Sequence, residues 1–492
     1  MVVKKFTFLS VILTVLVFVF RYDSFQDILL NIDEAEWIYC LKRCISNPIP
    51  FLGFDSHTTG PISIYLLAPI KLFNSDLSVV CLRAYGLSFM FILSLFVFNF
   101  LVAKYKFIYA IVFTSFLLIR DKDFYAFNTE WMLIPFLFFL VLLSQMRFGS
   151  SIKLKLVLLA LLNFLLPLIK FQSIIIVFFI ALYVLIQFYH KKDFLAVKWY
   201  CLINVLFLII FLILIQSTTG IGEFYFYYIE RNMAYASSFA TRPIKVIFIE
   251  YIYLLFKYFS YHIFFICFLF FSLIFSRKYS FFHLIKSLRF ELFLTLVCLL
   301  TVFIPKNNFL HYYQFLFIPF TLLIVRLLLI LDSNILKNSI YFLSFFLIPF
   351  GIRAADKLYD QFIKGSSINA LYYEKVDIVG INSILNYIPK KSSVFIFGWH
   401  KALPLYYNLR NSNRFTNPSG HTSFLIDLKE NKNIYQKEKK NILNVLKHSN
   451  VVLDAEHVLE QLQDNEINNA LIKSFNPIKV TDSYKFFIRK SN

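Results

Sequence analysis

The feature that most constrains this chain is the recurrence of long apolar segments along residues 1–354. Of the 492 residues, 59% are hydrophobic and only 16% are charged, a balance outside the range of soluble domains. A helix of about twenty apolar residues crosses the hydrocarbon core of a bilayer, and Tyr or Trp residues commonly mark its ends. The sequence therefore predicts a polytopic membrane protein made mainly of α-helices.

We predict about eleven membrane spans from these apolar runs. They are Phe6–Phe20, Val79–Val102, Phe107–Ile119, Trp131–Met146, Leu154–Ile169, Ser173–Tyr189, Tyr200–Ile215, Tyr258–Phe275, Phe290–Ile304, Phe315–Leu331 and Ser339–Ala354. No small-x-small cleavage site follows the first run, so we expect a membrane anchor there and not a cleaved signal peptide. Lysine and arginine collect in alternate short loops, which the positive-inside rule assigns to the cytoplasm. With an odd number of spans, loop 21–78 and the C-terminal segment would share the extracytoplasmic side.

The excess of lysine and arginine over acidic residues is explained by membrane topology. The net charge of +20 is the kind of value that nucleic-acid-binding proteins show, but most of it lies in short loops between spans. We therefore expect no nucleic-acid partner. The six cysteines lie in predicted spans or, for Cys40 and Cys44, one helical turn apart, and they form no disulfide or metal pattern.

Residues 355–492 differ from the rest in composition, being mixed charged and polar. Their pattern predicts a small soluble α/β domain that follows the transmembrane domain of residues 1–354. Helices are expected at Tyr373–Tyr387 and Lys437–Lys447, and strands at Ser393–Phe397, Val451–Leu453 and Tyr484–Arg489.

The candidate reaction site begins at the acidic pair Asp33-Glu34, which follows the first apolar run. Ionisable groups at a membrane face are functional candidates by default. An alternative is that Asp33 and Glu36 merely cap a helix. Trp37, Leu41, Cys44 and Ile45 would then form one apolar stripe of an interfacial helix lying on the membrane. A polar turn with His57 comes next, which could contact substrate or a metal or could simply be solvated.

Several short motifs follow one another along the chain. They are Asp33-Glu34 after the first span, the turn Gly60-Pro61, Arg83 with Gly86, Asn128-Thr129-Glu130, Lys170 at the end of a span, His311-Tyr312-Tyr313 before Pro319, and the late run Val394-Phe395-Ile396-Phe397-Gly398-Trp399. This order resembles the GT-C class of membrane glycosyltransferases, in the branch that contains protein O-mannosyltransferases and lipid A aminoarabinose transferase. The resemblance covers nearly the whole chain, but each motif is short.

The resemblance implies transfer of a sugar from a polyprenyl-phosphate or polyprenyl-diphosphate carrier to a glycan, lipid or protein acceptor on the outer face of the membrane. Asp33 matches the family's loop aspartate and would take the proton from the acceptor hydroxyl, with Glu34 beside it. Glu130 could orient the acceptor or share a divalent cation with Asp33 or Glu34, although the sequence does not require a cofactor. The abundance of Phe, Ile, Lys and Asn is typical of AT-rich bacterial genomes, so a bacterial plasma membrane is expected.

The departing lipid phosphate needs positive charge or hydrogen-bond donors where its charge develops. The external candidates for contacts to donor or acceptor are Lys170, Arg231, Arg242, Lys306, His311 and Tyr312. Each basic residue alone is also compatible with an interfacial side chain that extends to the headgroups, and Glu130 with an ordinary interfacial glutamate.

Three other classes of protein are alternatives to a GT-C enzyme. An O-antigen polymerase or ligase also uses lipid-linked glycans, but generally has its large external loop late in the chain. A transporter is disfavoured because the chain has only 11 glycines and no internal repeat. A non-catalytic subunit that has kept a glycosyltransferase fold stays open.

Overall fold

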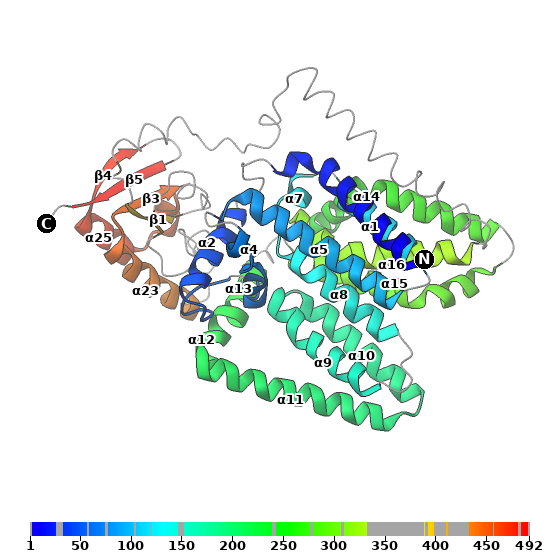
Figure 1. The fold of residues 1–492 in the computed structure, drawn as a ribbon. Coiled ribbons are helices and arrows are strands. Elements are labelled where there is room, and N and C mark those ends of the chain that lie inside the picture. Colours follow the sequence, from blue (N-terminus) through cyan, green and yellow to red (C-terminus); the bar gives the residue numbers. More distant parts are fainter. Residues whose placement is uncertain are drawn as a thin grey trace, which may run out of the picture. The chain divides into compact units, whose positions relative to one another are not determined.

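The computed structural model describes most of the chain. The described residues are 2–25, 33–56, 59–73, 77–102, 105–119, 121–145, 152–238, 243–275, 279–306, 309–331, 388, 392–397, 410–411, 432–455, 457–480 and 484–490. Within them the protein is mostly helical, and a small sheet is formed by strands near the C-terminus (Figure 1).

Six helical segments in the described residues are long and apolar enough to cross a membrane. They are α5 (Val79–Leu101), α9 (Ile152–Ile169), α10 (Ser173–His190), α11 (Phe194–Thr218), α14 (Ile244–Phe275), and the continuous segment of the 3₁₀-helix η4 (Leu310–Leu316) and α16 (Phe317–Ile330). This set indicates a membrane protein with a mainly helical fold.

The expected eleven spans are not all established by these helices. Three of them correspond to shorter apolar stretches: Lys5–Phe20 of α1 (Val2–Phe20), α6 (Lys106–Leu117) and α8 (Glu130–Gln145). The expected span Phe290–Ile304 falls within α15 (Phe281–Phe303), where Lys286, Arg289 and Glu291 lower the hydropathy. The expected span Ser339–Ala354 lies outside the described residues.

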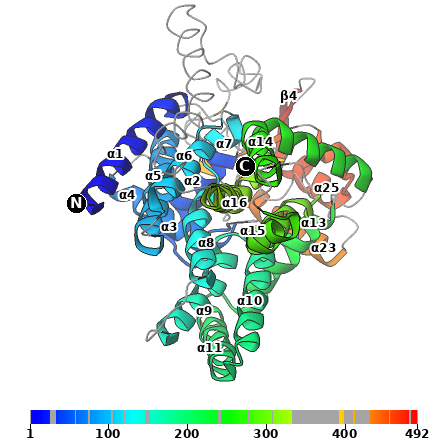
Figure 2. The ribbon, with the colours of Figure 1, turned by 90° about the vertical axis from the view of Figure 1, so that its right-hand side faces the viewer.

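The chain divides into two compact units that do not follow its order. Unit 1 comprises Met1–Gln26, Arg83–Ile210 and Arg242–Leu371. Its central helix is α16, which is seen almost end on in Figure 2 and packs against α6, α8, α14 and α15. Phenylalanine fills this interior: the rings of Phe98, Phe113 and Phe138 meet edge to face, with centroids 5.0–5.8 Å apart.

Three features of unit 1 fix the ends of its helices. Gly86 lets α5 approach the start of α8, because a Cβ there would lie 2.5 Å from the ring of Phe127. Short helical turns close the loops, at η1 (Tyr22–Phe25) and α7 (Lys122–Tyr125). Arg21, just after α1, donates to the carbonyl oxygen of Phe124 and stacks on the ring of Tyr125, which ties the first helix to the loop before α8.

Unit 2 comprises Asp27–Leu82, Phe211–Thr241 and Tyr372–Asn492. It therefore joins two loop regions of the expected membrane domain to the C-terminal segment. Its helices are α2 (Asp33–Ser46), α3 (Pro61–Leu67), α4 (Ile70–Phe73), α12 (Ile221–Phe224), the π-helix η2 (Tyr225–Glu230), α13 (Arg231–Ser238), α23 (Lys432–His448), α24 (Val458–Leu462) and α25 (Asn465–Ser474).

The sheet of unit 2 has five strands in the order β2-β1-β3-β5-β4. These are β1 (Ser393–Phe397), β2 (Arg410–Asn411), β3 (Val451–Ala455), β4 (Phe475–Val480) and β5 (Tyr484–Arg489). β1 pairs in parallel with β2 and β3, whereas β5 pairs antiparallel with β3 and β4. Apolar side chains of β1 and β3 pack against α23, α24 and α25 to form its core.

The expected strands at 393–397, 451–453 and 484–489 and the expected helix at 437–447 correspond to β1, β3, β5 and α23. β4 was not expected, because Pro477 and Lys479 break the apolar alternation that marks a strand. The expected helix Tyr373–Tyr387 lies outside the described residues.

Candidate functional site

The residues selected from the sequence fall in both compact units. Unit 2 contains Asp33, Glu34 and Arg231, and unit 1 contains Glu130, Lys170, Lys306, His311 and Tyr312. His57 and Arg242 lie outside the described residues. The expectation that Glu130 shares a divalent cation with Asp33 or Glu34 stays a prediction.

The start of α2 brings three acidic residues together. Asp33 is its first residue and half-buried, while Glu34 and Glu36 are 0% and 3% exposed. Carboxylates are favourable in the first turn, where the backbone N–H groups of a helix end are unpaired. Every residue from Glu34 to Leu41 is buried. The expectation of an interfacial helix with one apolar stripe is therefore wrong for this part of α2, since its polar side is enclosed as well.

An ion pair between Glu130 and Lys170 is the clearest polar feature of unit 1. Lys170 Nζ lies 2.9 Å from Glu130 Oε1, and the two side chains are 3% and 1% exposed. Glu130 is the first residue of α8 and Lys170 directly follows α9, so each charge occupies the helix end that the backbone dipole favours. The ring centroid of Tyr312 lies 5.3 Å from the ammonium, within cation–π range.

Several buried polar atoms, on Glu130 itself and on elements that adjoin Lys170 and Tyr312, have no hydrogen-bond partner among the described residues. They are Glu130 Oε2, Ser173 Oγ and both polar atoms of the Gln314 side chain, in residues that are at most 1% exposed. Ser173 begins α10 immediately after the Lys170 turn, and Gln314 shares η4 with Tyr312. Leaving such a group unmatched costs about 1–3 kcal/mol. Most buried polar atoms in proteins have a partner in the protein or in ordered water, so these atoms are candidates for contact with a ligand.

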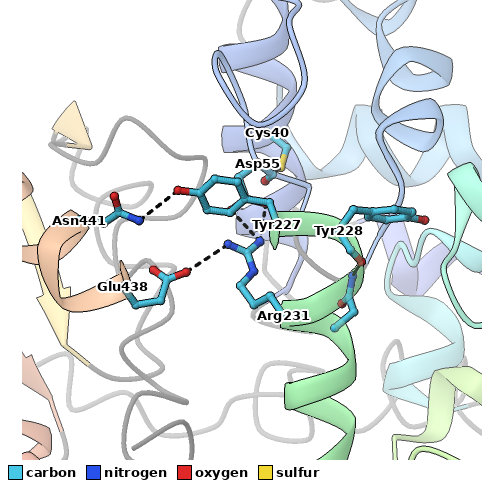
Figure 3. Close-up of polar contacts among 8 residues, drawn as sticks. Cys40, Asp55, Tyr227, Tyr228, Arg231, Glu438 and Asn441 are labelled. Atoms are coloured by element: carbon cyan, nitrogen blue, oxygen red, sulfur yellow. Dashed lines mark hydrogen bonds and ion pairs between the residues drawn. The ribbon is translucent and has the colours of Figure 1, made fainter. Parts of the chain in front are cut away.

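A second charged network lies in unit 2, around Arg231 (Figure 3). Arg231 begins α13, and its Nη2 donates to both carboxylate oxygens of Asp55 at 2.7 and 2.8 Å. Its Nη1 lies 3.5 Å from Oε1 of Glu438 on α23. All three side chains are at most 5% exposed. The cluster therefore buries two carboxylates with one guanidinium.

Neighbouring side chains complete this network. The ring centroid of Tyr227 lies 5.0 Å from the Arg231 guanidinium, and the Tyr227 hydroxyl accepts from Asn441 Nδ2 at 3.1 Å (Figure 3). The Cys40 thiol of α2 donates to the backbone carbonyl oxygen of Asp55 at 3.0 Å. The network thus connects α2, the turn at Asp55, α13 and α23.

Burial and charge act in opposite directions on the pKa values of this network. Burial raises the pKa of Glu438, and the nearby Arg231 only partly offsets this. Burial alone would lower the pKa of Arg231, but the carboxylates of Asp55 and Glu438 outweigh it and raise that pKa. Burial likewise raises the pKa of Tyr227 to about 12.

The other two basic candidates of unit 1 are His311 and Lys306. His311 is 7% exposed, stacks on Phe309 and meets the ring of Tyr312 at 4.5 Å. Lys306 follows α15 with a left-handed φ of 55° and forms no ion pair with a described residue. The part of the chain that the structure describes contains no group of three His, Cys, Asp or Glu side chains suited to a metal ion. Beside Glu130, the charge that a cation would supply comes from Lys170.

Some functional candidates were missed by the sequence. Asp55 lies in the same polar turn as His57 but does not stand out there, and Ser173, Gln314, Glu438 and Asn441 carry no functional motif. Asp55 and Arg231 are 176 positions apart, so no local pattern announces their pairing. Ser173 had one available signal, its position three residues after Lys170 at the start of an apolar run.

Comparisons with known proteins add no family: no family model, curated protein or solved structure matches this chain.

Proposed function

We propose that this chain is a membrane glycosyltransferase, which moves a sugar from a polyprenyl-phosphate or polyprenyl-diphosphate carrier to an acceptor on the outer face of a bacterial plasma membrane. The observation that supports it most is the buried Glu130–Lys170 pair with unmatched polar atoms on Glu130, Ser173 and Gln314. Charged groups enclosed at the ends of apolar helices commonly mark a substrate site in membrane proteins.

The chemistry of these groups suits a hydroxyl-rich ligand. Glu130 Oε2 can accept from a sugar hydroxyl, while Ser173 and Gln314 can each both donate and accept. The charge of Lys170 is already balanced by Glu130, which favours recognition of hydroxyls over capture of a phosphate by this pair. His311 and Lys306, the other basic candidates of this unit, are proposed to meet the phosphate.

The reaction would be a displacement at the anomeric carbon. A hydroxyl oxygen of the acceptor forms the new bond to that carbon as the bond to the phosphate oxygen breaks and its electron pair leaves with the lipid phosphate. The hydroxyl proton passes to a carboxylate, for which Asp33 is the proposed base. Glu130 is proposed to orient a hydroxyl of the bound sugar or acceptor.

The test is transfer activity of the detergent-solubilised protein with a panel of polyprenyl-phosphate-linked sugars. Asp33→Asn should lower turnover by about a hundredfold or more, the usual contribution of a positioned general base. Glu130→Gln should lower it by about a hundredfold, because a misplaced substrate hydroxyl reacts that much more slowly. Glu460→Gln, at a carboxylate of α24 that is 62% exposed, is the matched control and should keep its activity. Equal activity in all four proteins would remove both carboxylates from the mechanism.

The product distinguishes the nearest alternative. An O-antigen polymerase or ligase would use the same carriers but build or transfer a whole glycan chain. Products that carry a single added sugar would exclude a polymerase or ligase. Products that carry a whole glycan chain would refute the proposed single-sugar transfer and indicate a polymerase or ligase.

A further inference from the structure

The network around Arg231 joins parts of unit 2 that are far apart in the sequence. Asp55 follows α2, Arg231 begins α13, and Glu438 belongs to α23 of the C-terminal segment (Figure 3). A guanidinium shared between two buried carboxylates holds both of them, because each would be costly to leave unpaired. The C-terminal segment is thereby linked to the turn that follows α2.

One face of α23 makes this connection. Lys437, Glu438 and Asn441 lie at helical spacing and contact Glu223, Arg231 and Tyr227 respectively, with Lys437 Nζ 3.3 Å from Glu223 Oε1. Lys437 Nζ also lies 3.7 Å from the ring centroid of Phe226. The helix therefore docks on residues 223–231 through charges and aromatic rings together.

Residues 50–55 pack on the same segment from another direction. Phe51 contacts the rings of Phe224 and Tyr227 at 5.7 and 6.0 Å, and Thr219 Oγ1 donates to the Pro50 carbonyl oxygen at 2.8 Å. The Cys40 thiol then joins Asp55 to α2, the helix that begins at Asp33. A continuous path of contacts runs from α23 to the helix of the proposed base.

We propose that Arg231 and Glu438 are positioning residues, through which the C-terminal domain holds residues 50–55 and α2 in the arrangement that glycosyl transfer requires. The catalytic part of this statement rests on the proposed function. The positioning part does not, because it concerns only how tightly one segment of the protein holds another.

Cys40 provides a direct probe of this positioning, since its side chain is 0% exposed and its thiol contacts Asp55. The experiment uses full-length protein in which Cys44, Cys81, Cys201, Cys267 and Cys298 are replaced by Ser, and it measures the rate at which Cys40 is alkylated in detergent. Lys437→Glu places two carboxylates together and should speed labelling about three- to tenfold. Adding Glu223→Lys restores an ion pair and should return the rate toward that of the parent protein.

Two further variants refine the result. Glu438→Gln leaves the Asp55–Arg231 pair intact and should also speed labelling, whereas Lys440→Glu, at an exposed position of α23, should not. Unchanged labelling in Lys437→Glu and Glu438→Gln, or failure of the charge swap to restore it, would overturn the positioning role. Transfer activity that falls and recovers with the labelling rate supports the full proposal. Labelling that responds in a protein without transferase activity would refute the proposed function while leaving the positioning intact.

Discussion

Removal of the charge of Lys170 should destabilise the protein more than loss of a surface ion pair would. Lys170→Met keeps most of the hydrocarbon side chain but leaves the Glu130 carboxylate, which is 1% exposed, without its partner. Breaking a buried pair from one side costs about 3–5 kcal/mol, against about 0–1 kcal/mol for an exposed pair. Glu130→Gln leaves the buried ammonium and should cost a similar amount.

The double variant Lys170→Met/Glu130→Gln removes both charges together. Its stability should return to within about 1 kcal/mol of the parent protein, because neither buried group is then charged and unpaired. Its transfer activity should stay as low as that of Glu130→Gln, because the carboxylate acceptor is still missing. Thermal unfolding in one detergent and a transfer assay on the same samples measure the two effects.

Two results would refute this reasoning. If the double variant unfolds at the same temperature as the single variants, the pair is not coupled as its 2.9 Å geometry requires. If the double variant is stable and active, the pair is only structural and Glu130 has no part in the reaction.

Three further predictions follow from other parts of the structure. Asp454 is buried near the end of β3, and burial raises the pKa of its carboxyl group to about 6. Its contribution to stability is therefore complete below about pH 4, the pKa of the unfolded state, and is lost as the pH rises through about 6. Asp454→Asn should therefore remove up to about 3 kcal/mol of pH-dependent stability between pH 4 and 7, measured as a flatter plot of melting temperature against pH. Gly86→Ala should cost about 1–3 kcal/mol because its Cβ would press on the ring of Phe127, whereas Gly222→Ala, which meets no atom within 4 Å, should be near neutral in the same melting assay. Asp33→Asn should lose activity without loss of stability, since Asn caps helices about as well as Asp, and retained activity would show that Asp33 serves only as a cap.

The sequence predicted the elements whose own residues determine them. Ser393–Phe397 and Ser173–Tyr189 are continuous apolar runs, whose pattern indicates a buried strand or a membrane helix from the local sequence alone. Both correspond to observed elements. β4 lacked that signal because Pro477 interrupts it, and its place in the sheet depends on pairing with β5. Its strand conformation is thus a tertiary effect.

The candidate site was predicted only as separate residues. Glu130, Lys170 and Arg231 were each selected by charge and position. Their partners, however, are distant in the sequence: Glu130 and Lys170 are 40 positions apart, and Asp55 and Arg231 are 176 apart. Glu438 and Gln314 look like ordinary polar residues of a helix, and only their burial distinguishes them. Burial depends on how distant segments meet, so composition and spacing cannot report it.

The central claim is that this protein consumes a lipid-linked sugar, and the most direct measurement is the fate of that donor. Purified protein is incubated with polyprenyl-phosphate-linked sugars and extracted lipids, and the donor and free polyprenyl phosphate are quantified by mass spectrometry. We predict that one donor is converted to polyprenyl phosphate in the presence of acceptor, and that Asp33→Asn and Glu130→Gln convert it at least about a hundredfold more slowly. Conversion of no donor by the folded protein, or equal conversion by both variants, would contradict the account.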